Sequence, residues 1–148
     1  MPQPLLEANL IAPGLLVGSA PPLGSAVRHS GVDVLVLCAE EFQPSSRNFP
    51  GVLVIHAPFD DGELDEATRR MSREAASRVA LHMQEGRTVL VTCMAGRNRS
   101  ALVAALALMR LTGLPGAEWA AHLRRKRRPR CGGEVLSNPD FYDALQRA

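Results

Sequence analysis

Three short runs of valine and leucine most constrain how this chain can fold. They are "VDVLVLCA" at 32–39, "GVLVIHAP" at 51–58 and "TVLVTC" at 88–93, and the first two are bounded by Gly, Pro or acidic residues. Short apolar runs rich in valine are typical of strands that are covered on both faces, as in parallel sheets. A further strand is predicted for "LLVGSA" at 15–20, which follows a Pro-Gly turn.

Helical patterns lie between and after these strands. We expect a short helix that Gly31 ends, and longer helices over 66–85, 100–112, 117–128 and from Pro139 onward. Asp65 can cap the 66–85 helix, and Asn138 can cap the last one. The apolar stripe of the 66–85 helix consists of Ala67, Met71, Ala75, Val79 and Met83.

The alternation of strands and helices predicts an α/β fold with a central, mainly parallel sheet flanked by helices. The 100–112 segment is apolar nearly all round, which predicts a central, buried helix. A chain of 148 residues can bury a core without a metal or disulfide, so we expect a single domain.

Composition narrows the setting and the partners. Cys38, Cys93 and Cys131 form no CxxC pair, which indicates reduced thiols and a cytoplasmic protein. A net charge of +2 and few aromatic residues give no reason to expect a nucleic-acid partner. The N-terminal stretch does not have the pattern of a signal peptide, and no apolar run is long enough for a membrane span. We expect a monomer.

The stretch "CMAGRNRS" at 93–100 joins a predicted strand to a predicted buried helix. Ligands of such folds bind beyond the carboxyl ends of the strands, and unpaired N–H groups at a helix start attract oxyanions. The same donors favour the thiolate form of a cysteine such as Cys93. Arg99 can bind two phosphate oxygens at once, and Gly96 permits a tight loop. The loop therefore suits attack of sulfur on a phosphoryl group, although a structural cysteine beside a surface loop is the alternative.

These eight residues resemble the C-x5-R-[ST] signature of cysteine-dependent protein phosphatases, and their context resembles the dual-specificity branch of that family. The similar segments cover most of the chain and follow the family's order: "IAPGLLVGSA", "HSGVDVLVLCAE", "HLRRKRRP" and "NPDFYDAL". The resemblance implies a cysteine-phosphatase fold and a dual-specificity-phosphatase-like catalytic domain over 1–148.

The resemblance also implies a role for each loop residue. Cys93 would be the nucleophile that forms a thiophosphate intermediate, Arg99 would bind the phosphate and the transition state, and Ser100 would donate a hydrogen bond to the sulfur. The backbone that would cradle the phosphate oxygens belongs to Met94, Ala95, Gly96, Arg97 and Asn98.

The family uses an aspartate as a general acid, because an alkoxide or phenoxide leaves poorly without a proton. "HAPFDDGELD" offers Asp60 and Asp61, and the family pattern P-x-x-D, counted from Pro58, favours Asp61. Either aspartate could instead be an ordinary turn or cap residue.

Two features depart from the pattern or remain open. Thr92 stands where the family usually has a histidine. A threonine can still hydrogen-bond locally, so we interpret this change as an adjustment of the pKa of Cys93 and not as a loss of activity. The basic run at 124–130 is either a solvated helix end favoured by the helix dipole or a surface that recruits an acidic substrate.

The function that we expect is hydrolysis of phosphomonoesters without metal or cofactor. Phosphotyrosine on proteins is the expected substrate, with phosphoserine and phosphothreonine as further substrates. The alternatives are the same chemistry on a phosphoinositide, a nucleotide or an RNA 5′ end, or a phosphate-binding pseudophosphatase.

Overall fold

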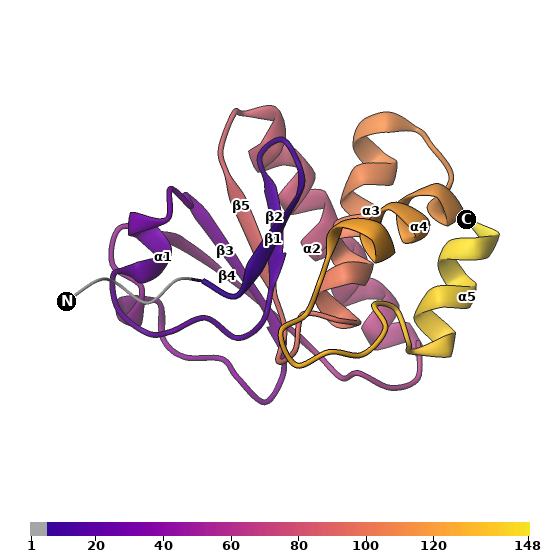
Figure 1. The fold of residues 1–148 in the computed structure, drawn as a ribbon, viewed down its shortest axis with the longest axis horizontal. Helices are drawn as coiled ribbons and strands as arrows, with labels where there is room; N and C mark the ends of the chain where they lie inside the picture. The colour runs from indigo at the N-terminus through magenta and orange to yellow at the C-terminus, as the bar shows by residue number, and fades with distance from the viewer. Residues whose placement is uncertain (1–5) are drawn as a thin grey trace.

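A computed structural model describes residues 6–148, which form an α/β fold around one five-stranded sheet (Figure 1). Its strands are β1 (Ala8–Ala12), β2 (Leu15–Gly18), β3 (Val34–Ala39), β4 (Leu53–Phe59) and β5 (Val89–Thr92). They lie in the order β1-β2-β5-β3-β4, and all neighbours are parallel except β1 and β2. The predicted fold class is therefore confirmed. Residues 1–5 of the N-terminal stretch discussed above lie outside the described residues.

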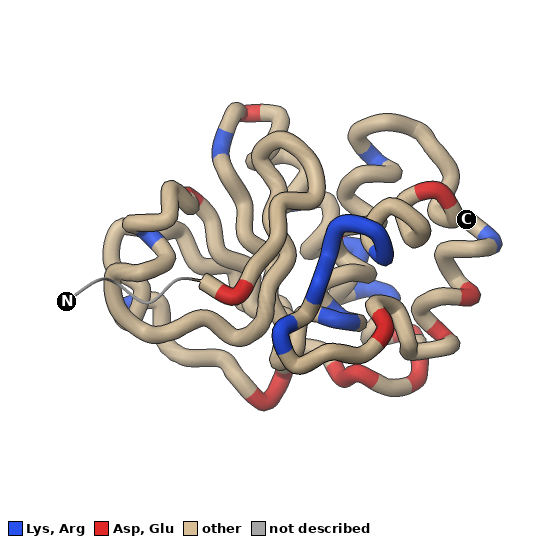
Figure 2. Tube along the Cα trace, in the orientation of Figure 1, with Lys and Arg blue, Asp and Glu red and all other residues tan. Residues whose placement is uncertain are grey.

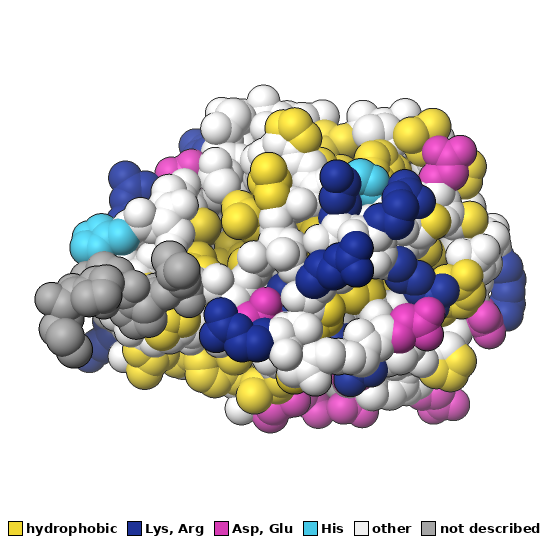
Figure 3. Space-filling view, in the orientation of Figure 1, with side chains coloured by type: hydrophobic (Ala, Val, Ile, Leu, Met, Phe, Trp, Pro, Cys, Tyr) yellow, Lys and Arg dark blue, Asp and Glu magenta, His cyan; other side chains and the backbone are white. Residues whose placement is uncertain are grey.

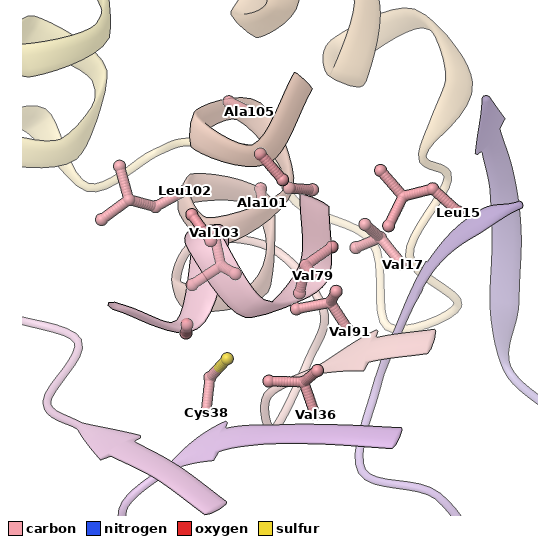
Figure 4. Close-up of a cluster of buried hydrophobic side chains, with 14 of the residues drawn as sticks. Leu15, Val17, Val36, Cys38, Val79, Val91, Ala101, Leu102, Val103 and Ala105 are labelled. Atoms are coloured by element: carbon pink, nitrogen blue, oxygen red, sulfur yellow. The ribbon is translucent and has the colours of Figure 1, made fainter. Parts of the chain in front are cut away.

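Helices cover the two faces of the sheet unequally. The larger core lies beneath α2 (Glu66–Gln84), α3 (Arg99–Thr112), α4 (Gly116–Lys126) and α5 (Pro139–Arg147). On the other face α1 (Ala26–His29) and the short 3-10 helix η1 (Ser46–Asn48) accompany a smaller core. Figure 4 shows the larger core, where side chains of α3 lie over Val36 of β3 and Val91 of β5. Every residue of β3 and β5 is buried, as their apolar runs predicted.

Strand β4 corrects one expectation. Its burial alternates, so that Ile55, Ala57 and Phe59 are buried while Leu53 and His56 are exposed. The run at 51–58 was expected to be covered on both faces. It is instead the edge strand of the sheet: α2 packs on one of its faces, whereas the other carries exposed residues. An apolar run alone does not distinguish these two positions.

Strand β1 was not predicted at all. It pairs with β2 at the other edge of the sheet, where Ile11 is buried and Leu10 is 60% exposed. Its five residues, ANLIA, form an apolar stretch too short to be recognised as a strand, and only Ile11 among them is fully buried.

The predicted apolar stripe of α2 is only partly buried in the structure. Ala75 and Val79 are buried and Met71 and Met83 pack against the core, but Ala67 is exposed. A strict four-residue spacing turns by about 40° per step relative to a helix of 3.6 residues per turn, so the ends of such a stripe rotate away from the core. The helix begins at Glu66, as predicted, and ends at Gln84, one residue before the predicted end. Asp65 is the predicted N-cap, and its side chain accepts a hydrogen bond from the Thr68 N–H (2.8 Å).

The central helix α3 positions the predicted loop. It begins at Arg99, directly after the loop, and ends at Gly113, whose φ of 75° suits a glycine C-cap. Nine of its fourteen residues are buried, all of them between Arg99 and Leu108, in line with the buried helix that its apolar sequence predicted. Within residues 6–148, no helix has the length and apolar character needed to cross a membrane.

Candidate active site

The loop at 93–98 leaves the carboxyl end of β5, the middle strand of the sheet, and runs directly into α3 (Figure 1). Both flanking elements are buried, so the ends of the loop are held in place by the core. Gly96 has a φ of 68°, a left-handed conformation that a glycine adopts without strain.

The loop's carbonyl groups are all bound from outside. The carbonyls of residues 94–98 accept, in order, from the Ala20 N–H (3.1 Å), Arg127 Nη2 (3.1 Å), Arg127 Nε (2.9 Å), the Leu136 N–H (2.7 Å) and the Leu102 N–H (2.9 Å). The N–H groups of the same residues donate to no acceptor within residues 6–148. This one-sided pattern is what an anion-binding cradle requires.

Cys93 lies at the base of this cradle. Its side chain is buried, and its Sγ lies 3.1 Å from the Oγ of Ser100, a fully buried residue in the first turn of α3. The sulfur and the hydroxyl therefore form a hydrogen-bonded pair at the helix start, where the helix dipole favours negative charge.

Arg99 lies beside them with a side chain that is 6% exposed. Its Nη1 and Nη2 donate to the two carboxylate oxygens of Glu41 (2.5 and 2.8 Å), and Nη1 also donates to the Phe59 carbonyl (3.1 Å). Its buried Nε has no acceptor within the described part of the chain. A bound oxyanion would supply that acceptor.

The ion pair between Arg99 and Glu41 shifts both pKa values. The hydrogen bond from Arg99 lowers the pKa of Glu41 from its usual 4.5 to about 2. Burial alone would lower the pKa of Arg99, but Glu41, Cys93 and Asp61 outweigh it and raise the pKa. Arg99 therefore carries its positive charge at every physiological pH.

The predicted acid candidates lie on the loop between β4 and α2. Asp61 accepts hydrogen bonds from the Nδ2 atoms of Asn98 (3.0 Å) and Asn138 (2.9 Å), so its carboxylate is tied to the end of the cradle. The neighbouring Asp60 is exposed, and its Oδ2 lies close to Gly62 instead. The structure thus brings Asp61, Cys93, Arg99 and Ser100 to one edge of the sheet.

The remaining cradle residues differ in what their side chains do. Arg97 turns away from the cradle and donates to the Glu134 carbonyl (3.4 Å) and the Ser137 hydroxyl (3.1 Å). Met94 is 43% exposed. For these residues the backbone, rather than the side chain, faces the anion position.

Thr92 and Cys38 lie beneath the site. The Thr92 hydroxyl donates to the Val36 carbonyl of β3 (2.9 Å), so its partner is the neighbouring strand, 56 positions away, instead of the local group that was expected. Burial, together with the charge of Cys93, raises the pKa of the Cys38 thiol well above its usual range. Cys38 is therefore a protonated core residue.

The basic run at 124–130 is only partly the solvated helix end that was one of its two interpretations. Most of its cations are exposed, but the side chain of Arg127 is fully buried and bound to Glu7, and Arg124 stacks on the Tyr142 ring at 3.9 Å. Figure 2 shows most of the run as one basic segment that leaves the end of α4, with a short non-basic break before its last residue. A buried arginine inside such a run cannot be recognised without its partner, which lies 120 residues away.

Sequence reasoning also missed Glu41 and Asn138 as site residues. Glu41 follows the carboxyl end of β3, so the rule that ligands bind at strand ends could have found it. Asn138 was predicted to cap α5 and does so, but its Nδ2 also holds Asp61. Among residues 6–148, no three His, Cys, Asp or Glu side chains are grouped as metal ligands would be.

Comparison with known proteins identifies the family to which this chain belongs. No family model matches the chain. The chain is 32% identical over 149 residues to human dual specificity phosphatase 28, and the match covers 99% of this chain and 78% of that protein.

Solved structures agree with this match. The crystal structure of human DUSP28 superposes with a TM-score of 0.76 at 28% identity, covering 99% of this chain and 94% of that one. Tk-PTP in its active form has a TM-score of 0.76 at 24% identity, covering 95% of each chain, which supports the fold. The chain belongs to the dual-specificity phosphatase family.

Proposed function

We propose that this protein hydrolyses phosphomonoesters through a thiophosphate intermediate on Cys93. The observation that supports the proposal is the one-sided loop that follows Cys93: the carbonyls of residues 94–98 are bound from outside, while the N–H groups of the same residues have no protein acceptor among residues 6–148. A dianionic phosphate group is the ligand that such a ring of donors fits.

In the first step the thiolate of Cys93 attacks the phosphorus atom. The bond from phosphorus to the ester oxygen breaks, and that oxygen takes a proton from the carboxyl group of Asp61. The loop N–H groups and the guanidinium of Arg99, through its unpaired Nε, stabilise the charge on the phosphoryl oxygens.

In the second step water attacks the phosphorus and the sulfur leaves. Asp61, now a carboxylate, takes a proton from the water, and the bond between phosphorus and sulfur breaks. The Ser100 hydroxyl donates a hydrogen bond to the departing thiolate and keeps its proton, a role that fits the 3.1 Å between its Oγ and Sγ. Inorganic phosphate is released and the thiolate returns.

Asp61 is the proposed acid rather than Asp60. Its hydrogen bonds to Asn98 and Asn138 hold it next to the cradle, and its charge contributes to the raised pKa of Arg99. Asp60 has no comparable link to the loop.

The proposed substrates are phosphotyrosine, phosphoserine and phosphothreonine on proteins, in keeping with the family. Charge stabilisation by Arg99 and the loop backbone requires neither metal nor cofactor. Residues 1–148 would act as one catalytic domain, as a monomer in the cytoplasm, where the three thiols stay reduced.

The test is a panel of phosphopeptides, phosphoinositides, nucleotides, 5′-phosphorylated RNA and a small aryl phosphate, with Cys93→Ser as control. We expect release of phosphate from phosphopeptides and the aryl phosphate, resistance to EDTA, and no turnover by Cys93→Ser. Turnover of the nonprotein phosphates alone would overturn the protein substrate. A Cys93→Ser variant as active as the parent would overturn the mechanism, and a parent that binds phosphate without turnover would be a pseudophosphatase.

A further inference from the structure

One arginine lies behind the loop, on the side away from the proposed phosphate. Arg127, the residue that ends α4, has a side chain with no exposed surface. Its Nε donates to the Gly96 carbonyl (2.9 Å) and its Nη2 to the Ala95 carbonyl (3.1 Å). An arginine therefore contacts two adjacent peptide groups of the cradle from behind.

The rest of the guanidinium is bound by the N-terminal segment. Nη1 and Nη2 donate to the two oxygens of Glu7 (2.8 and 2.5 Å), and Nη1 also donates to Asn9 Oδ1 (3.0 Å). Every N–H of the guanidinium thus has an acceptor, in the fork geometry that only arginine offers. Burial on its own would raise the pKa of Glu7, but the bonds from Arg127 outweigh it and lower the pKa. Arg127 and Glu7 therefore form an ion pair, whereas a buried arginine without such a partner would strongly destabilise the fold.

The geometry of the peptide bond turns these two contacts into an orientation of donors. In a trans peptide the carbonyl and the following N–H point in opposite directions. A carbonyl of Ala95 that points back at Arg127 makes the N–H of Gly96 point forward, and the carbonyl of Gly96 does the same for the N–H of Arg97. These are two of the five N–H groups that would receive the phosphate oxygens.

The approach of Arg127 leaves no room for adjustment at Gly96. A Cβ atom there would collide with Arg127 Nη2 and would lie 2.7 Å from the Gly18 carbonyl carbon and oxygen. The loop is thus packed between Gly18, at the end of β2, and the guanidinium.

We infer that Arg127 is a positioning residue for the phosphatase reaction, which sets the direction of the Gly96 and Arg97 N–H groups by binding the carbonyls behind them. The inference rests on the proposed function of the loop as a phosphate cradle. It also assigns separate roles within the basic run: Arg127 is structural to the cradle, whereas Arg125, Lys126 and Arg128 are exposed. Figure 3 shows basic side chains gathered on this surface of the molecule.

The test compares Arg127→Lys and Arg127→Met with two control variants. Arg128→Ala removes an exposed charge from the adjacent position, and Val79→Ala truncates a fully buried side chain of α2. The second control measures what a general loss of stability does to the site. For all variants we would measure the thermal midpoint, kcat and KM on an aryl phosphate, and the affinity for orthovanadate.

Misdirecting these two donors should reduce kcat at least about 100-fold in Arg127→Met, because the loss of a single oxyanion donor typically costs about that much. KM should change less than kcat, since the donors matter most in the transition state. Vanadate affinity should fall about 10-fold or more, and Arg127→Lys should lie between Met and the parent, because a lysine can bind one carbonyl but not two and Glu7 as well. Both controls should stay within about 2-fold of the parent, even where Val79→Ala unfolds at a lower temperature.

Folded Arg127 variants with kcat and vanadate affinity within 2-fold of the parent would overturn the inference, as would a Val79→Ala variant that loses as much as they do. If Arg127→Met does not fold, Arg127→Lys and Glu7→Gln decide, and the same loss is expected in smaller degree. The proposed function fails separately: a parent without phosphatase activity would refute it, and vanadate affinity would still show whether Arg127 shapes the cradle.

Discussion

The ion pair between Glu41 and Arg99 should stabilise the folded protein by an amount that follows from the pKa of Glu41. Replacing Glu41 by Gln keeps one acceptor oxygen but removes the charge that faces a guanidinium only 6% exposed. The pKa of Glu41 falls from 4.5 to about 2, a difference equal to at most about 3.5 kcal/mol at about 1.4 kcal/mol per pKa unit. Because the Glu41 side chain is 50% exposed, solvent screens the interaction, and we expect Glu41→Gln to lose about 1–2 kcal/mol of unfolding free energy at pH 7.

The pH dependence of this loss has a definite sign. Glu41 has a pKa that is lower in the folded state than in the unfolded chain, so its contribution is complete above pH 4.5 and disappears as the pH falls toward 2. The difference in unfolding free energy between the parent and Glu41→Gln should therefore narrow by about half between pH 7 and pH 3.

Urea denaturation of both proteins at several pH values measures this difference. Glu66→Gln is a suitable control, because Glu66 pairs with Arg70 at 3.6 Å on an exposed helix surface and should contribute little. A Glu41→Gln variant as stable as the parent at pH 7, or a difference that stays constant down to pH 3, would refute the assignment of Glu41 as the partner that holds Arg99.

Two further predictions concern the proton and the sulfur. Asp61→Asn should lower kcat by about 100-fold on an alkyl phosphate, because its leaving oxygen needs a proton, and much less on an aryl phosphate with an acidic leaving group; a loss of this kind in Asp60→Asn instead would move the acid to Asp60. Ser100→Ala should slow breakdown of the thiophosphate, so that rapid-quench measurements give a burst of released alcohol followed by a slower steady state. A Ser100→Ala variant with unchanged burst and steady-state rates would exclude the proposed role of its hydroxyl.

Local sequence was enough to predict the loop and its supports. The strand β5, the loop at 93–98 and the helix α3 are contiguous, so hydrophobicity, Gly96 and the spacing of Cys93 and Arg99 all lie within one short segment. The cap at Asp65 and the stop at Gly113 are local signals of the same kind.

What could not be predicted depends on partners far away in the chain. In the sequence, nothing distinguishes Arg127 from the exposed cations beside it. Its role depends on Glu7 and on the Ala95 and Gly96 carbonyls, which only the fold brings to it. Glu41 likewise could not be recognised as the partner of Arg99 from its neighbours in sequence, because Arg99 lies 58 positions further on. The exposed face of β4 was missed for a related reason, because an apolar run does not reveal whether a strand lies at the middle or the edge of a sheet.

The central claim is that phosphate passes through the sulfur of Cys93. Rapid quenching of the enzyme with denaturant at alkaline pH during turnover of an aryl phosphate, followed by mass spectrometry of its peptides, tests this claim directly. We expect one added phosphoryl group on the peptide that contains Cys93, and none on that peptide from Cys93→Ser. Steady turnover with no phosphorylated Cys93 peptide at any quench time, or a phosphoryl group on another residue, would contradict it.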